Sequence, residues 1–338
     1  MRKTISLLAI ASLFLLAACN QDAGIKETES AEADVPTSSS EREPDIQKEE
    51  EVEDEPEDVA LSENIGEMDI DFTGDVKLEG QKLTIDGKSN LLEGSKLYVQ
   101  IDWLEGYLIG GNRVAMVEPD GSFTFETELP EKVDGHLTVE IKFELINQNE
   151  DIRGHYGETG DRLEGQFVRL SDYDQETQYQ KASAIVEIAQ NLGQTEAEII
   201  APEWDQPEDY GTTEIRIDSI DVTKDDEYIY VSGKSNLLEG TKLRGRALIP
   251  NYITSGFIGH ATVNPDGSFR ILFENPETNE RIKNLADYEI TVETDIFGTS
   301  YPDVLTTYGE NGRKMTGSLV EDEGEGKMAK VELQEKAE

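Results

Sequence analysis

The triplet Gly87-Lys88-Ser89 has the residue types that end a phosphate-binding loop, and it recurs as Gly233-Lys234-Ser235. A phosphate loop of this kind requires an earlier glycine at a fixed spacing and a helix after the triplet. Here the flanking residues alternate between apolar and polar, which predicts a strand on each side. Asn90 and Gly94 suit the tight or left-handed backbone of a turn. We therefore interpret the triplet as part of a structural turn.

Histidine and cysteine, which most often hold zinc or act as base and nucleophile, are scarce in this chain. The three histidines, His136, His155 and His260, occupy no equivalent positions in the two copies of the repeat described below, and Cys19 is the sole cysteine. A duplicated zinc site would repeat its ligands in both copies or cluster them in one. One cysteine also excludes an intrachain disulfide. We predict no catalytic residue, no metal ligand and no cofactor, and we expect a protein that is not an enzyme.

Carboxylates are abundant, and calcium is the cation that carboxylate oxygens favour. Two groups of aspartates could supply such oxygens: Asp69, Asp71 and Asp75 in the first copy, and Asp218, Asp221, Asp225 and Asp226 in the second. Neither group has the ligand spacing of a helix–loop–helix calcium site. With 73 acidic residues in the chain, near-matches of this sort arise by chance. Calcium therefore stays an alternative partner and not the main prediction.

The elements that would position any site come from an internal repeat. The stretch GKSNLLEGSKL, from Gly87 to Leu97, returns 146 residues later as GKSNLLEGTKL, from Gly233 to Leu243. The turn sequence Pro119–Phe123 returns as Pro265–Phe269 at the same spacing. Self-similarity at a fixed period indicates a duplicated structural unit. The chain therefore contains one module twice.

Both copies show the alternation of half-buried strands and not the period of a helix. The clearest apolar series are Leu97, Val99, Ile101 and Trp103; Phe123 and Phe125; Leu137, Val139, Ile141 and Phe143; and, in the second copy, Phe269, Ile271 and Phe273. Further strands are expected around 68–72, 83–86, 113–118, 166–168 and 184–188. Seven or eight short strands with turns between them resemble an immunoglobulin-like sandwich. We predict an all-β protein with two tandem antiparallel β-sandwich modules.

The predicted modules cover residues 66–190 and 213–335, with a linker at 191–212. The linker contains Pro202, Pro207 and many acidic residues, and Thr195–Ile200 is expected to form a short helical turn. Trp204 is the odd residue of the linker. Because tryptophan favours partial burial, we expect Trp204 to dock on a module and to fix the angle between the two.

Residues 19–65 form an acidic segment before the first module. This segment is rich in Glu, Asp, Ser and Pro, and it lacks the apolar residues needed for a core. Its like charges predict an extended, disordered tether. The whole chain of 338 residues has 30 basic residues against 73 acidic ones, a net charge of −43, so its surface repels nucleic acids and anionic lipids.

Residues 1–18 have the parts of an export signal. Arg2 and Lys3 form a positive start, Ile5–Leu16 is an apolar run too short for a comfortable membrane span, and Leu16-Ala17-Ala18-Cys19 ends the segment. This arrangement resembles the lipobox signal of bacterial lipoproteins. The resemblance implies cleavage before Cys19 and a diacylglycerol on its sulfur. Two acyl chains are enough for stable anchoring, so we expect the protein on the outer face of the cell membrane.

Large apolar residues cluster where a turn is expected after the strand that ends at Trp103. In the first copy they are Trp103, Leu104, Tyr107, Leu108 and Ile109, and in the second Tyr252, Ile253, Phe257 and Ile258. Exposed apolar loop tips on an acidic protein would form a binding edge. Alternatively, a hairpin turn at Glu105-Gly106 would let these side chains close the core. Both interpretations stay open from the sequence.

These features favour an extracytoplasmic lipoprotein that acts as a binding or structural module for a cell-envelope protein or polymer. A metal-ion or small-ligand sensor with a site between the modules is the alternative.

Replacement of Cys19 tests the anchor. We expect Cys19→Ala to leave the signal uncleaved at this site or to release the protein in soluble form, because the acyl acceptor is gone. Membrane fractionation with mass spectrometry of the N-terminus measures this. Unchanged membrane association of wild type with no lipid on Cys19 would contradict the prediction.

Overall fold

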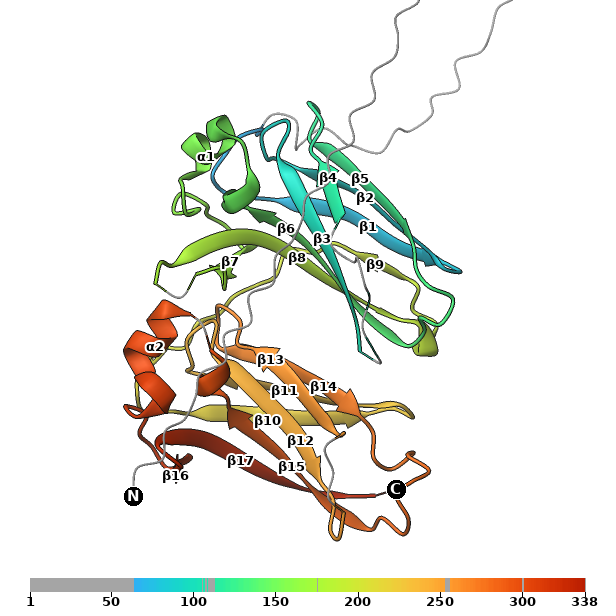
Figure 1. The fold of residues 1–338 in the computed structure, drawn as a ribbon, viewed down its shortest axis with the longest axis vertical. Coiled ribbons are helices and arrows are strands. Elements are labelled where there is room, and N and C mark those ends of the chain that lie inside the picture. The colour runs from blue at the N-terminus through green and yellow to red at the C-terminus, as the bar shows by residue number, and fades with distance from the viewer. Residues whose placement is uncertain are drawn as a thin grey trace, which may run out of the picture. The chain divides into compact units, whose positions relative to one another are not determined.

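Two antiparallel β-sandwiches make up the part of the chain that the computed structural model describes (Figure 1). The described residues are 64–337 without 105, 107, 109–112, 175, 253–255 and 300. They belong to one of the two units into which the chain divides, residues 55–338. The predicted signal, Cys19 and nearly all of the tether lie outside the described residues. Within the described part, no helix is both long and apolar enough to cross a membrane.

The first sandwich consists of two sheets with strand orders β5-β2-β1-β9 and β4-β3-β6-β8-β7. The first sheet contains β1 (Phe72–Glu79), β2 (Lys82–Ser89), β5 (Ser122–Glu128) and β9 (Glu196–Glu198). The second contains β3 (Lys96–Trp103), β4 (Arg113–Met116), β6 (His136–Glu144), β7 (Val168–Ser171) and β8 (Tyr179–Ala189). Three short helices interrupt the strands: η1 (Leu145–Asn147), α1 (Glu150–Tyr156) and η2 (Gln190–Leu192). The division of the main strands between two sheets is that of immunoglobulin-like sandwiches, with β4 beside β3.

The second sandwich repeats this plan with the orders β10-β11-β14 and β13-β12-β15-β17-β16. Its first sheet contains β10 (Ile217–Lys224), β11 (Tyr228–Ser235) and β14 (Ser268–Glu274). Its second contains β12 (Lys242–Leu248), β13 (Ile258–Thr262), β15 (Asp287–Thr294), β16 (Val320–Glu323) and β17 (Gly326–Lys336). The helices are η3 (Ile296–Gly298), α2 (Pro302–Tyr308) and η4 (Glu310–Gly312). The all-β prediction with two tandem sandwiches is therefore confirmed.

Each sandwich has its own hydrophobic core, built from the residues that alternate in the sequence. In β3 and β6 the apolar series is buried from Leu97 to Ile101 and from Leu137 to Phe143, while Trp103 is half-buried. In the second core, Phe269, Ile271 and Phe273 of β14 are buried. Full burial of such a side chain stabilises the fold by about 1.5–3 kcal/mol. The two apolar faces of each sandwich thus hold the module together without a disulfide.

Several local expectations were wrong. The stretch 195–200 forms the strand β9 and not a helical turn, because Ala197 pairs with Val76 of β1. The strand expected at 68–72 begins at Phe72 and runs on to Glu79. Helices α1 and α2 were not expected; Asn149 begins α1 by accepting a hydrogen bond from Ile152 N–H at 2.9 Å. The strand expected at 166–168 is β7, from Val168 to Ser171.

The Gly-Lys-Ser triplets, expected in a turn, instead end the strands β2 and β11, and the turn follows them from Asn90 and from Asn236. The buried asparagine of each turn completes the hydrogen bonds of its neighbours. Asn90 Oδ1 accepts from Asp71 N–H at 2.9 Å, and its Nδ2 donates to Asp69 C=O at 2.6 Å. In the second copy, Asn236 Oδ1 accepts from Arg216 N–H at 2.9 Å, and its Nδ2 donates to Glu214 C=O at 2.8 Å. The asparagine amide therefore takes the place of a paired strand for the segment that leads into each sandwich.

A tyrosine and a glycine fix the other parts of the same turn. The Tyr156 hydroxyl accepts from Leu92 N–H at 3.0 Å, and the Tyr308 hydroxyl accepts from Leu238 N–H at 3.0 Å. Gly121 has φ +80°, and a Cβ there would collide with the carbonyl oxygen of Ser89. The second repeated block, Pro-Asp-Gly-Ser, is therefore the turn that packs against the first. This contact explains why both blocks recur with the same spacing.

Removal of the Asn236 side chain tests the role of this turn. Asn236→Ala leaves a buried amide N–H and a carbonyl without partners, so we expect the free energy of unfolding of the second module to fall by about 2–4 kcal/mol. Urea denaturation of the variant measures the loss, and the exposed Asn191→Ala is the matched control. Equal midpoints for the two variants would show that the amide is dispensable.

Candidate functional site

Of the apolar residues predicted at the tip of the first module, one is packed against its core and another is exposed to solvent. Trp103 Nε1 donates to Asp134 C=O at 2.6 Å, and Lys132 Nζ lies 5.5 Å from the centre of its ring. Gly106 lies close against the ring, where a Cβ would collide with it. Leu104, by contrast, is 40% exposed. Trp103 therefore closes the end of the first core, and Leu104 remains available to solvent.

The corresponding residues of the second module divide in the same way. Phe257 is buried in the second core, whereas Tyr252 is 38% exposed. The Tyr252 hydroxyl accepts a hydrogen bond from Lys283 N–H at 2.9 Å. Three further predicted loop residues, Tyr107, Ile109 and Ile253, lie outside the described residues. Of the residues described, Leu104 and Tyr252 are thus the exposed apolar tips.

A groove brings the first of these loops beside the second module. Its cavity volume is about 690 Å³. From the first module, Trp103 at the end of β3 and Leu104 and Leu108 after it supply apolar lining. From the second module, Ile258 of β13 and Leu272 of β14 supply further apolar lining. His136, Glu187, His260 and Arg270 also line it. The structure therefore places four of the predicted loop residues in one groove: Trp103, Leu104, Leu108 and Ile258.

The polar wall of the groove is held by contacts that cross from one module to the other. The Arg270 guanidinium of β14 forms an ion pair with the Glu187 carboxylate of β8, and it lies over the Tyr230 ring at 5.0 Å. His136 is buried at the start of β6, with its ring 6.1 Å from that of Tyr228. Burial lowers the pKa of His136, against the opposing charge of Glu187. The groove thus has one charged wall whose groups are largely paired.

The linker is bonded into both sandwiches. On the side of the first module, Ile199 N–H donates to Gly74 C=O at 2.7 Å, and Trp204 Nε1 donates to Gln166 C=O at 2.7 Å. The Arg169 guanidinium lies 4.8 Å from the centre of the Trp204 ring. Trp204 therefore docks on the first module, as expected from the sequence. Gln206 Nε2 then donates to Pro265 C=O of the second module at 2.7 Å.

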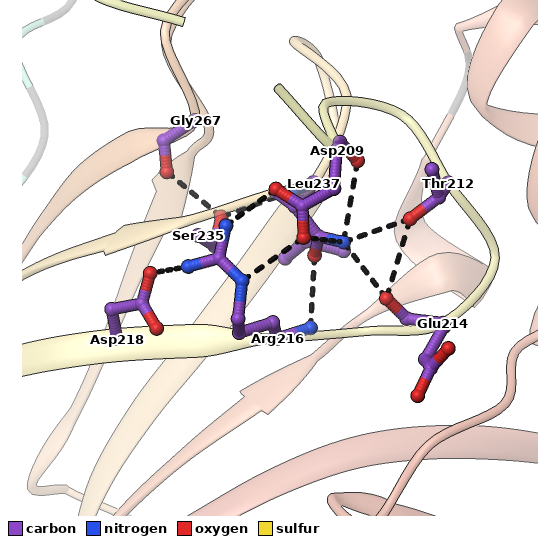
Figure 2. A network of polar contacts seen from close by, with 9 residues as sticks. Asp209, Thr212, Glu214, Arg216, Asp218, Ser235, Leu237 and Gly267 are labelled. Atoms are coloured by element: carbon purple, nitrogen blue, oxygen red, sulfur yellow. Dashed lines mark hydrogen bonds and ion pairs between the residues drawn. The ribbon is translucent and has the colours of Figure 1, made fainter. Parts of the chain in front are cut away.

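Figure 2 shows how the end of the linker joins the second sandwich. Arg216 donates from Nε to Asp209 Oδ2 at 3.0 Å and from Nη2 to Asp209 Oδ1 at 2.5 Å, and it also pairs with Asp218. The hydrogen bonds from Arg216 lower the pKa of Asp209 more than any other contact does. Thr212 Oγ1 accepts from Asn236 Nδ2 at 3.0 Å. Residues 209–212 are therefore part of the second module's polar network.

The structure places the aspartates considered for calcium in different roles. Asp69 and Asp71 line a cavity of about 370 Å³ with Glu67, and burial raises the pKa of Asp71. Asp218 forms an ion pair with Arg216. Asp225 stabilises a turn, because its Oδ1 accepts a hydrogen bond from Tyr228 N–H at 2.7 Å. Among the described residues, no group of three or more His, Cys, Asp or Glu side chains could hold a metal ion.

The histidines differ in environment although two of them share the groove. His136 and His260 both line it, one buried and the other exposed. His155 lies apart in α1, where its Nε2 is 2.6 Å from the Gly66 carbonyl oxygen. No serine or cysteine is among the described residues that line the groove. The groove lining thus includes one buried and one exposed imidazole and the hydroxyl of Thr138.

Comparisons with known proteins give only distant similarity. No protein-family model matches the chain, and no curated protein matches it. Among solved structures, it is similar to a tetra-tandem repeat in the extending region of a large adhesion protein, with 15% identity over 77% of this chain and 46% of that chain, and a TM-score of 0.21. It is also similar to a DUF3823 family protein from Parabacteroides merdae, with 9% identity over 62% of this chain and 82% of that chain, and a TM-score of 0.21.

The chain thus spans less than half the length of the adhesion-protein chain that it matches. Similarity at these values supports no inference about function. The assignment of two β-sandwiches rests on the sheets of this chain itself.

Sequence reasoning missed the charged residues of the joint between the modules. Arg169, Glu187 and Arg270 lie far apart in the sequence and carry no motif, and Glu239 belongs to a repeated block that predicts only a turn. One signal was present: Arg169 aligns with Glu321 of the second copy, a reversal of charge at equivalent places of β7 and β16. The fold that the two copies share therefore does not require a cation at Arg169.

Two single substitutions separate the core and surface interpretations of the Trp103 loop. Trp103→Ala should lower the free energy of unfolding of the first module by about 1.5–3 kcal/mol, because a half-buried ring and a hydrogen bond to Asp134 are lost. Leu104→Ser should change it by less than about 0.5 kcal/mol, because Leu104 is largely exposed. Urea midpoints followed by the remaining Trp204 fluorescence and by circular dichroism measure both. A larger loss for Leu104→Ser would refute this division.

Proposed function

We propose that this protein is a lipid-anchored extracytoplasmic lipoprotein that serves as a structural and binding module of the cell envelope. The anchoring part is supported by the positive start, the apolar run and the ending Leu16-Ala17-Ala18-Cys19 of the N-terminal segment. The acidic residues 19–65 would then extend from the membrane and hold the two sandwiches at a distance. Two acyl chains on Cys19 supply the anchor.

The bonded linker carries the structural part of the proposal. Its residues pair with β1 of the first sandwich, contact Gln166 through Trp204 and join the second sandwich through Asp209 and Gly211 N–H, which donates to Asn236 C=O at 2.7 Å. A linker that only tethered two domains would need none of these bonds. Such bonds restrict bending between the modules, which is what a spacer or a rigid display scaffold requires.

The groove carries the binding part. It combines exposed apolar side chains, such as Leu104, with the charged groups of Glu187 and Arg270 and the imidazole of His260. A linear ligand with both apolar and charged groups, such as an extended peptide of an envelope protein or a strand of wall polymer, matches this lining. A cavity of about 690 Å³ is also of the size that binds a short segment and not a whole domain.

A binding experiment with a matched pair of variants tests this function. The soluble chain from residue 20 onward is incubated with isolated cell-wall polymer and with detergent-solubilised envelope proteins. We expect wild type to bind one of these fractions and Leu104→Ser with Ile258→Ser to bind it at least about tenfold more weakly. Leu192→Ser with Ile200→Ser is the control, because it removes two exposed apolar side chains outside the groove.

Each outcome decides a separate point. If the groove variant binds as well as wild type, the groove is not the binding surface. If wild type binds neither fraction, the binding role is wrong, and only the spacer role is left.

A further inference from the structure

The joint between the modules includes a carboxylate that accepts a hydrogen bond across it. Glu239 lies in the second copy of the GKSNLLEG turn, and its Oε1 accepts from the backbone N–H of Leu170 in β7 at 2.7 Å. The Leu170 side chain packs against the second module's core. One short stretch of β7 therefore inserts a backbone donor and an apolar side chain into the second module.

A half-buried cation accompanies this contact. Arg169 Nη1 donates to Asn264 Oδ1 at 2.7 Å, and its guanidinium stacks on Trp204. Its Nε has no hydrogen-bond partner among the described residues. The charges of Glu239, Glu140 and Asp266 favour the charged form of Arg169, although burial lowers its pKa. Arginine keeps its charge at any physiological pH, so the joint holds a constant positive charge beside a carboxylate.

The duplication shows that these residues serve the joint and not the fold. Glu93, the counterpart of Glu239 in the first copy, is exposed. Arg169 and Leu170 correspond to Glu321 and Asp322 of the second copy, which cannot repeat the contact. Glu239 is half-buried, and because the same turn leaves its glutamate exposed where no module docks, docking of β7 contributes to this burial, beside Tyr210 and Tyr301.

Protonation of Glu239 should therefore depend on docking. Burial raises the pKa of Glu239 from 4.5 to about 7, against the opposing effects of the Leu170 N–H, Arg169 and Lys181. An undocked Glu239 would lose the cover of β7, so its pKa would lie closer to the ordinary value of a glutamate. The docked state then binds a proton more tightly than the undocked state, so docking is strongest at low pH and weakens as the pH rises through about 7.

Few neighbouring groups change charge over the same range. The charged or titratable groups around Glu239 are Arg169 on β7, Lys181 on β8, Tyr210 in the linker and Tyr301 before α2. One step further out, Asp172 faces Tyr301, and Asp266 faces Tyr210 and Arg169. Burial raises the pKa of Tyr210 to about 12, and it also raises that of Tyr301. Glu140 on β6 is buried, but Lys181 and Ser183 hold its pKa below the ordinary value.

We propose that Glu239, with Leu170 and Arg169, forms a pH-responsive latch that holds the two modules docked in mildly acidic surroundings and loosens them at alkaline pH. An extracytoplasmic surface would be exposed to such changes directly. The latch does not depend on the proposed anchor or on any envelope ligand. It changes only the stiffness of the joint.

A second titrating group in the joint acts in the opposite direction. Because burial lowers the pKa of His136, the docked state favours the neutral ring, and docking weakens as the pH falls below 6.5. Overall docking should therefore be strongest at weakly acidic pH. Since Glu239→Gln retains His136, the ratio between wild type and this variant isolates the effect of Glu239.

Hydrogen exchange of the whole chain tests the latch. Exchange of residues 168–171 and 237–240 is measured at pH 5.5, 7.0 and 8.5, with correction for the intrinsic rates, in wild type, Glu239→Gln and the matched control Glu93→Gln. The amide introduced by Glu239→Gln is neutral at every pH and can still accept from Leu170. Relative to that variant, the docking equilibrium of wild type should fall roughly 10- to 30-fold from pH 5.5 to 8.5. Glu93→Gln should behave as wild type.

Two results would overturn the latch. One is an identical pH dependence of exchange in wild type and Glu239→Gln. The other comes from wild type alone: a ¹³C carboxyl titration in which Glu239 titrates near pH 4.5. This second measurement stays decisive if the variant fails to fold. Neither result bears on binding to envelope fractions, so failure of the latch and failure of the proposed function are distinguishable.

Discussion

Each sandwich depends on one buried asparagine side chain in a turn where three parts of the module meet. The segment that leads into the first strand would otherwise enter a buried region with unpaired backbone groups, which cost about 1–3 kcal/mol each. Asn90 and Asn236 supply a donor and an acceptor for it, and both are at most 3% exposed. Leu91 and Leu237, next to them, fill the core. One short block therefore supplies hydrogen bonds to the entering backbone and also an apolar side chain to the core. This double role explains why the block is nearly identical in the two copies.

Residues that differ between the two copies include those that join the modules to each other. Arg216 in the second copy is the counterpart of Asp71 in the first: the backbone N–H of each donates a hydrogen bond to the asparagine of its own turn. Arg216 binds Asp209 of the linker, which the first module has no reason to do. Asn264 accepts a hydrogen bond from Arg169, whereas the counterpart of Asn264 in the first copy is Glu118. The duplicated fold thus acquired its joint by a few charge changes at its ends, and the cores stayed alike.

The sequence predicted what depends on local pattern and missed what depends on distant pairs. Alternation in Leu97–Ile101 and Leu137–Phe143 is a direct consequence of one buried face, so those strands and the fold class could be found. Helix α1 could also have been found, since Asn149, Glu150 and Gly157 are ordinary start and stop signals. β9 could not, because its three residues become a strand only by pairing with β1. The groove joins β3 with β13, and no local signal reports such a meeting.

The acidic character of the chain, with a net charge of −43 over all 338 residues, makes the joint between the modules sensitive to pH and salt. Two acidic modules repel one another, and the contacts that oppose the repulsion are made by a few cations such as Arg169 and Arg270. Ion pairs near a surface contribute little and are screened by salt, whereas the apolar cores respond little to either pH or salt. Changes in the surroundings should therefore act on the angle between the modules well before they act on the folding of either one.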